Sequence, residues 1–432
     1  MYCVNASLME AVEAARETEA SLREYLALFL TRFGQAEENI HSFIPEQNLK
    51  RRILIEAEAL MKKFPQLIDR PPLFGVPVGI KDLLHADGFL TRAGSNLPPE
   101  LLTGEEASIV AKLRSLGGII AGKTVTEQFA YSGPIPTRNP NNLNHTPGGS
   151  SAGSAASVAA GICPLAIGTQ TMQSIIAPAS FCGVVGYKIS YGRIPIDGVI
   201  LLSPSFDSIG LFTQDMDSMD LAASLVVPDW KPYHSDRKPV LGIPNGIYMS
   251  LMDPRVKKTF QDQIEGLQKC GYTVRYADMP WEDSFIAGDA MLRFVQGEMA
   301  RVHNNWFDRY ADLYGAQVHR AIIIGREIDD KELDQYRSGQ QEIRNNLEDL
   351  KRVEGIDLWV SPAQGGTAPK YGERTGWPGM TAIWSYAGCP SISIPGAAID
   401  GLPLGFQCIG SYGKDEELLY WSKQISLELG AG

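Results

Sequence analysis

A run of small residues from 146 to 156 gathers side chains that can do nucleophilic chemistry. It reads Thr-Pro-Gly-Gly-Ser-Ser-Ala-Gly-Ser-Ala-Ala and contains Ser150 and Ser151, and Ser174 follows further along the chain. Glycine permits backbone dihedrals that other residues avoid, and small neighbours leave hydroxyl and amide N–H groups uncovered. Such runs are also typical of linkers and tight loops. The run therefore indicates a serine nucleophile only if a base accompanies it.

We expect Lys81 to be that base. A serine hydroxyl is a poor nucleophile until a base takes its proton. The six histidines form no metal-spaced pair, and no Gly-x-Ser-x-Gly sequence occurs in a strand-to-helix setting, which argues against a Ser-His-Asp triad. Lys81 ends the apolar run 74–80, where burial would lower its pKa from about 10.4 toward neutrality. The alternative is a lysine that extends from the end of a strand into solvent.

One motif in the sequence is misleading. Residues 117–124 satisfy the phosphate-loop pattern of a glycine, four variable residues and Gly-Lys-Thr. A phosphate loop follows a strand and opens a helix. Here a predicted helix precedes Gly117, and a predicted strand occupies the variable positions. The sequence therefore argues against nucleotide binding.

The composition excludes several classes of protein. Of 432 residues, 44% are hydrophobic and 21% are charged, and the formal net charge is -11. This is ordinary for a soluble globular protein and argues against a nucleic-acid partner. No apolar run is long enough to span a membrane, the N-terminus does not resemble a leader, and the six cysteines are scattered as in reduced proteins. We expect a cytoplasmic protein without membrane partners, metal or other cofactor.

The order of predicted elements favours an α/β fold. Helices are predicted over about 7–33, 48–63, 105–115 and 154–160, and strands over 74–80, 119–121, 356–360 and 391–395. Strands alternate with helices, so we expect one domain over 1–432. The segment 1–65 is expected to be helical. Segment 230–354 is expected to be a mainly helical insertion within the same domain, because the flanking segments would complete one sheet.

Several segments together resemble the amidase signature family, in both order and spacing. The resemblance runs from about 73 to 410, and the segments that carry it are 74–82, 121–124, 146–156, 181–188, 388–395 and 402–410. It implies a central mixed, mostly parallel twisted sheet that is covered by helices on both faces. It also implies an enzyme that cleaves amide-type C–N bonds.

The resemblance also implies a role for each of the three polar residues. Ser174 matches the nucleophile, Ser150 matches the bridging serine that follows a cis peptide bond, and Lys81 matches the base. Lys81 would take a proton from Ser150 while Ser150 takes one from Ser174, and the relay would reverse to protonate the leaving amine. The backbone N–H groups of Thr171, Met172, Gln173 and Ser174 would stabilise the oxyanion.

The chain departs from the family around the nucleophile. Where the family has Gly-Thr-Asp-Thr-Gly-Gly-Ser-Ile-Arg, residues 168–176 read Gly-Thr-Gln-Thr-Met-Gln-Ser-Ile-Ile. Gln170 can form hydrogen bonds as the aspartate does but carries no charge. Met172 and Gln173 replace two glycines and add side chains beside the substrate. Ile176 replaces a cation that could hold a substrate carboxylate, which predicts a neutral, fairly apolar substrate.

Finer features point to a branch of the family and to a pocket. Gln170, Pro178-Ala179 and the turn 191–195 resemble the branch that includes carbamate-cleaving urethanases. We expect a small amide or carbamate as substrate, and cleavage of a carbamate would release carbon dioxide. The residues expected to contact substrate are Ser151, Met172, Gln173, Phe129 and Tyr131. Four further aromatic residues could form a wall of the pocket, although an aromatic residue more often packs in the core. They are Trp306, Tyr310, Trp377 and Trp384.

Two other functions stay open. The first is the glutaminase subunit of an amidotransferase complex, which would share the three polar residues but pass ammonia to partner chains. The absence of a cation at 176 argues against glutamine as substrate. The second is a non-catalytic binding protein with an amidase fold, which the altered pair Met172-Gln173 suggests. The sequence also leaves a homodimer open.

Overall fold

A large sheet crosses the whole molecule and carries the elements that hold the candidate site. The computed structural model describes residues 2–376 and 378–430, and in them the sheet has ten strands. From one edge to the other the strands are β2 (Ile119–Thr124), β1 (Pro77–Lys81), β3 (Leu165–Gln170), β5 (Ser208–Thr213), β4 (Val185–Lys188), β9 (Ser391–Ile399), β10 (Leu402–Ile409), β8 (Leu358–Pro362), β6 (Leu241–Pro244) and β7 (Val274–Ala277).

Strand direction divides this sheet into three parts. The pairs β1–β2 and β1–β3 at one end, and β6–β7 and β6–β8 at the other, are parallel. The pairs between β3 and β8 are antiparallel. β1 lies between two parallel neighbours and is buried along its whole length, which explains the unbroken apolar run before Lys81. The prediction of one mixed α/β sheet is confirmed.

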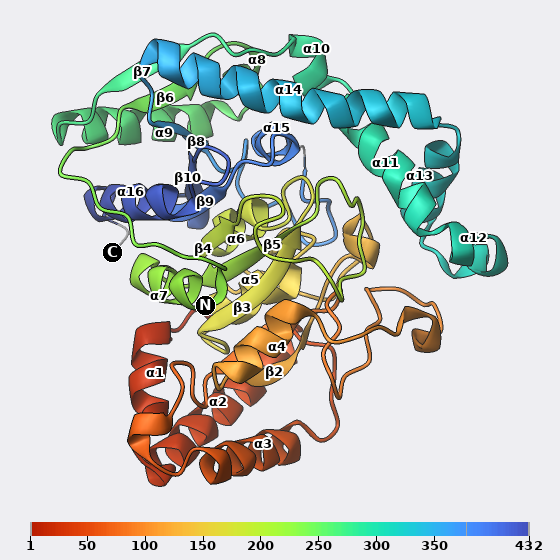
Figure 1. Cartoon of the computed structure of the whole chain (residues 1–432), viewed down its shortest axis with the longest axis vertical. Coiled ribbons are helices and arrows are strands. Elements are labelled where there is room, and N and C mark those ends of the chain that lie inside the picture. Colours follow the sequence, from red (N-terminus) through yellow and green to blue (C-terminus); the bar gives the residue numbers. More distant parts are fainter. Residues whose placement is uncertain (1, 377, 431–432) are drawn as a thin grey trace.

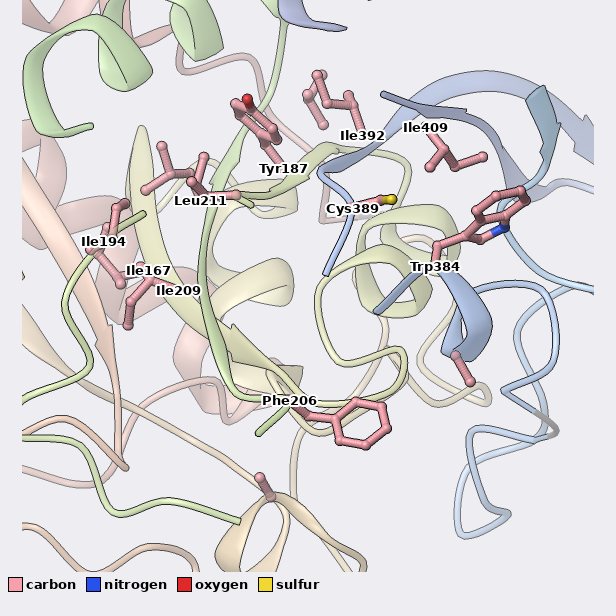
Figure 2. Packing of buried hydrophobic residues seen from close by; sticks show 14 of the residues in the cluster. Ile167, Tyr187, Ile194, Phe206, Ile209, Leu211, Trp384, Cys389, Ile392 and Ile409 are labelled. Carbon is pink, nitrogen blue, oxygen red and sulfur yellow. The ribbon is translucent and has the colours of Figure 1, made fainter. Parts of the chain in front are cut away.

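Helices cover both faces of the sheet (Figure 1). On one face α5 (Ala152–Ala159) packs against β3 and β5, and α6 (Ile176–Cys182) packs against α5, β4, β9 and β10; small side chains such as Ala155, Ala166 and Ala179 belong to this core. On the other face lie α4 (Ser108–Ser115), α7 (Met216–Val226) and α16 (Asp415–Glu428). Figure 2 shows part of this second core, where Ile167, Leu211 and Tyr187 gather.

The N-terminal segment forms α1 (Leu8–Arg16), α2 (Glu19–Ile40) and α3 (Leu49–Lys63). The first predicted helix, over 7–33, is in fact two helices. Thr18 adopts an extended conformation, and its side chain accepts a hydrogen bond from the backbone N–H of Ser21 while the Ser21 side chain binds the N–H of Thr18. This capping box begins a new helix, which a periodicity of apolar residues alone does not reveal.

Residues 230–354 contribute both helices and two strands. The helices are α8 (Ile247–Ser250), α9 (Pro254–Lys269), α10 (Asp283–Ala287), α11 (Ala290–Val302), α12 (Asn304–Tyr310), α13 (Ala316–Arg326) and α14 (Asp330–Glu354). Helices α11 and α13 pack together, and α14 runs along the top of the view in Figure 1. Strands β6 and β7 from the same segment form one edge of the sheet. The chain then returns through α15 (Ala382–Tyr386).

Short 3-10 turns complete the fold, and the phosphate-loop pattern falls on a strand. The turns are η1 (Leu67–Asp69), η2 (Pro99–Leu102), η3 (Gln128–Ala130) and η4 (Ala311–Leu313). Lys123 of the phosphate-loop pattern lies inside β2, is buried, and forms an ion pair of 3.0 Å with Asp82. In the described part of the chain, no helix is both long and apolar enough to cross a membrane.

Candidate active site

Lys81 lies at the C-terminal end of β1 and is buried, with its amine among hydroxyl groups. Its Nζ donates hydrogen bonds to Ser150 Oγ at 2.8 Å, to Ser151 Oγ at 2.9 Å and to Thr169 Oγ1 at 2.9 Å. The carbonyl oxygen of Thr169 lies 3.2 Å away. Strand β1 thus delivers the lysine to the beginning of α5 and to the end of β3.

Burial lowers the pKa of Lys81 to about 7, and the nearby carboxylates of Asp207 and Glu127 oppose this shift. A charged ammonium loses its hydration on burial, so the neutral amine is favoured. None of the side chains that Lys81 contacts is an acid. A fraction of the protein therefore carries an uncharged amine here near neutral pH, which a base requires.

Ser150 enters the site through a tight connection before α5. The peptide bond between Gly149 and Ser150 is cis. A Cβ atom on residue 149 would lie 2.6 Å from the carboxyl carbon of Glu127, so any residue other than glycine here would displace the Glu127 side chain. A Cβ atom on Gly153 would lie 2.1 Å from the carbonyl oxygen of Ser42. The small residues of the run are thus explained by close packing around Ser150.

Ser174 follows β3 in a loop that precedes α6, and Gln170 holds this loop. Gln170 Oε1 accepts hydrogen bonds from the backbone N–H groups of Ile175 at 2.8 Å and Ile176 at 3.0 Å. Its Nε2 donates to Ser385 Oγ at 2.9 Å. The neutral amide therefore supplies the acceptor for the first N–H groups of the helix, and its second group ties the loop to α15.

The residues that replace the family's glycines fit this loop without left-handed backbone. Neither Met172 nor Gln173 has a positive φ. The carbonyl oxygen of Met172 accepts hydrogen bonds from Thr381 Oγ1 at 2.8 Å and Ser385 Oγ at 3.3 Å. Within the described residues, the backbone N–H groups of Met172, Gln173 and Ser174 have no acceptor. They are free to donate to a bound group.

Asp207 is a buried acid that the sequence did not reveal. Its Oδ1 accepts a hydrogen bond from Thr171 Oγ1 at 2.5 Å, and its Oδ2 accepts from the N–H groups of Leu202 at 2.7 Å and Ser203 at 3.0 Å. Burial raises the pKa of Asp207 to about 6. The contact with Thr171 fixes the beginning of the loop that carries Ser174. Asp207 lies in a segment without a recognisable motif, so its contact with Thr171 is seen only in the folded structure.

A cavity of about 640 Å³ opens beside Ser174. The loop residues from Thr171 to Ser174 form one wall together with Gly149 and Glu127, and helices α11 and α13 form another. Ser174 is 6% exposed. Within the described residues, no hydrogen bond joins Ser174 Oγ to Ser150 Oγ. The structure therefore brings Lys81 and Ser150 into contact and places Ser174 at the cavity wall.

The residues expected to contact substrate divide into two groups. Met172, Gln173 and Tyr131 line the cavity. Ser151 is fully buried beneath it against Lys81 and the carbonyl oxygen of Thr169. Phe129 is buried in the core and does not line the cavity. Its ring stacks on that of Tyr314, with 5.5 Å between the ring centroids.

Of the additional aromatic residues, the three that the structure describes, Trp306, Tyr310 and Trp384, do not line the cavity either. Trp306 and Tyr310 pack against the core, Trp384 is fully buried, and Trp377 lies outside the described residues. Polar residues that the sequence did not indicate line the cavity instead, because α11, α13 and the segments after β2 and β8 meet only in the folded chain. These residues are Glu127, Gln296, Gln317, Arg320 and Arg374.

Among the described residues, Glu127 is the one acid that lines the cavity beside Ser174. Its backbone N–H donates to the carbonyl oxygen of Ser150 at 3.3 Å. Burial raises the pKa of Glu127 to about 7, while Lys81 and Arg374 oppose the shift. Within the described residues, no group of three or more His, Cys, Asp or Glu side chains could hold a metal ion.

Comparison with known proteins agrees with this architecture. The family model described as Amidase matches residues 24–419. The chain is 29% identical over 469 aligned positions to a glutamyl-tRNA(Gln) amidotransferase subunit from Clostridium novyi (strain NT), with 97% of this chain and 96% of that protein covered.

Two solved structures show the same fold. One, described as a crystal structure of amidase, is 30% identical, covers 99% of this chain and 100% of its own, and has a TM-score of 0.87. The native peptide amidase from Stenotrophomonas maltophilia is 21% identical with a TM-score of 0.80, covers 98% of this chain and 96% of its own, and is similar in fold. The chain belongs to the amidase signature family and is a hydrolase of amides.

Proposed function

We propose that the protein cleaves the C–N bond of small amides or carbamates through an acyl-enzyme on Ser174. The observation that carries this proposal is the buried Lys81 amine, which lies 2.8 Å from Ser150 Oγ and whose pKa is lowered to about 7. A buried lysine that contacts only hydroxyl groups and a carbonyl oxygen has no structural ion pair to explain it. Proton transfer does explain it.

In the first half of the reaction, Ser174 Oγ bonds to the substrate carbonyl carbon. Its proton passes to Ser150 Oγ while the Ser150 proton passes to Lys81 Nζ. The free N–H groups of Met172, Gln173 and Ser174, with that of Thr171, stabilise the negative charge that develops on the carbonyl oxygen. Lys81 then returns the proton through Ser150 to the leaving nitrogen. The C–N bond breaks, and an acyl ester remains on Ser174.

In the second half, water takes the place of the serine. Lys81 and Ser150 accept its proton, its oxygen bonds to the acyl carbon, and the ester bond to Ser174 breaks as the proton returns to Ser174 Oγ. An amide gives a carboxylic acid and an amine. A carbamate gives an amine and a carbonate half-ester, which decomposes to an alcohol and carbon dioxide. The resemblance of Gln170 and the following residues to the urethanase branch supports carbamates.

Labelling of Ser174 tests this proposal. We expect a fluorophosphonate probe to label the wild-type protein at Ser174 and to leave Ser174→Ala unlabelled. Ser174→Ala should lose hydrolysis but unfold at the wild-type temperature, because one hydroxyl at the cavity wall fills no packed volume. A folded Ser174→Ala variant with wild-type turnover would contradict the nucleophile assignment. Absence of label in the wild type would favour a non-catalytic protein with an amidase fold.

A glutaminase subunit is the second candidate, because relatives that match nearly the whole chain are named as amidotransferase subunits. Such a subunit would need partner chains to use the ammonia. Kinetics of the isolated protein on glutamine, simple amides and aryl carbamates would separate the two functions. A preference for glutamine would favour the glutaminase.

The sequence composition and the cysteines also support proposals about the location, partners and cofactors of the protein. We infer a cytoplasmic protein, since all six cysteines are free and four of them are buried. A small molecule is the expected partner, without nucleic acid or membrane. No separate cofactor enters the proposed reaction, because Lys81, Ser150 and Ser174 supply every proton transfer.

A further inference from the structure

The charged groups of the cavity are two arginines and one glutamate. Arg320 belongs to α13, Arg374 lies between β8 and α15, and Glu127 follows β2. No other charged residue lines the cavity among the described residues. Both arginines are exposed to solvent, so they stand at the open side of the cavity.

Neither arginine has an ionic or hydrogen-bonding partner within the described part of the chain. Most other arginines do: Arg52 and Arg293 form ion pairs, and Arg344 binds the carbonyl oxygen of Ala387. A guanidinium presents five N–H donors in a planar arrangement that matches a carboxylate. Both arginines of the cavity therefore have their donors available. The others whose side chains have no such contact with described residues are Arg51, Arg92 and Arg309.

The residues that line the cavity carry a net charge opposite in sign to that of the whole protein. The chain has a formal net charge of -11, which would repel anions. Inside the cavity the two guanidiniums face a single carboxyl, and burial raises the pKa of that carboxyl, Glu127, to about 7. Near neutral pH the cavity wall is therefore net positive. A net positive cavity in a protein that is otherwise acidic favours the binding of an anion in that cavity.

The expectation of a neutral substrate depended on Ile176. The structure places Ile176 at the first position of α6, fully buried in the core, and it does not line the cavity. Ile176 therefore contributes nothing to the wall of the cavity or to its charge. That charge comes from α13 and from the segment before α15.

We propose that Arg320 and Arg374 bind an anionic group, a carboxylate, that the substrate carries in addition to the bond it presents to Ser174. This inference rests on the proposed function, because it names the substrate class of the same cavity. The two arginines belong to different segments that line the same cavity. They act on specificity and leave the proton relay through Lys81 and Ser150 unchanged.

The test compares amides that differ only in a terminal carboxylate. Succinamate, glutaramate and adipamate are paired with butyramide, pentanamide and hexanamide, and kcat/KM is measured for each at low and high salt. The wild type should prefer at least one acid over its neutral partner, and salt should weaken that preference. Arg320→Met and Arg374→Met should each reduce kcat/KM for the acid by about tenfold or more, mainly through KM. The neutral amides should change little.

Three further variants control for charge and for geometry. Arg51→Met removes an arginine of α3 that also has no partner among the described residues but lies outside the cavity, so it should leave the preference unchanged. Arg320→Lys and Arg374→Lys keep the charge but lose the planar donor pair, so they should give intermediate values.

The outcomes separate this inference from the proposed function. Equal kcat/KM for acid and neutral amide in the wild type, or an unchanged ratio in both methionine variants, would overturn the inference while hydrolysis of the neutral amides upheld the proposed function. Failure to cleave any amide, together with absence of label on Ser174, would overturn the proposed function itself.

Discussion

The amine of Lys81 lies 2.8 Å from the hydroxyl of Ser150, although 69 residues separate them along the chain. Strand β1 ends at the lysine, and the glycines before α5 bring the serine to the same point. Both side chains are fully buried. This contact is the physical basis of the proposed proton relay.

Ser150 and Ser151 both contact Lys81, which provides a matched pair of variants. We expect Ser150→Ala to reduce kcat on a primary amide by about a hundredfold or more, because the relay passes through its hydroxyl. Ser151→Ala should cost much less activity, since Ser151 Oγ also donates to the carbonyl oxygen of Thr169 and has a positioning role. Steady-state kinetics of the two variants checks this. Equal losses would contradict a relay through Ser150 alone.

The rate should depend on pH through Lys81. The neutral amine is the active form, and the pKa of Lys81 is lowered to about 7 by burial. The kcat/KM for a neutral amide should therefore rise with pH, about tenfold per unit below pH 7, and level off above it. Ionised Glu127 favours the charged form of Lys81, so Glu127→Gln should move the midpoint to lower pH. A profile that is flat from pH 5 to 9 would exclude this lysine as the base.

Gln170 should contribute to stability as well as to the shape of the loop that carries Ser174. Gln170→Ala removes the acceptor of two buried N–H groups, and we expect a loss of about 1 to 3 kcal/mol in the free energy of unfolding. Activity should fall with it, because the loop carries Ser174. Denaturant unfolding measures the effect, with Gln268→Ala on the exposed surface of α9 as the control. Equal stability of the two variants would show that Gln170 is dispensable.

Met172 and Gln173 should determine which substrates fit. Both line the cavity, and neither needs glycine's dihedrals. Met172→Gly and Gln173→Gly should change the ratios of kcat/KM among a small carbamate, a bulky aryl carbamate and a primary amide by about tenfold or more. Gln173 Nε2 also donates to the carbonyl oxygen of Gly376 at 3.1 Å, so its loss also releases that segment. Uniform scaling of all three rates would refute a role in the pocket.

The sequence predicted the elements near the candidate site better than it predicted the cavity. The apolar run before Lys81 and the small residues around Ser150 are local features, and the structure explains both by burial and close packing. Arg320 and Arg374 lie in segments without a motif, and only the packing of α13 and of the segment before α15 brings them to Ser174. Phe129 shows the opposite case. Its aromatic ring suggested a pocket wall, but it packs on Tyr314 in the core.

The most direct measurement is detection of the acyl-enzyme during turnover. The wild-type protein is mixed with an aryl carbamate or anilide, quenched in acid within the first turnovers, and digested for mass spectrometry. The account predicts that the peptide with Ser174 gains the mass of the acyl group, and that added hydroxylamine diverts this group to a hydroxamate. Turnover without any acyl group on Ser174, or with the acyl group on Ser150 instead, would contradict the account.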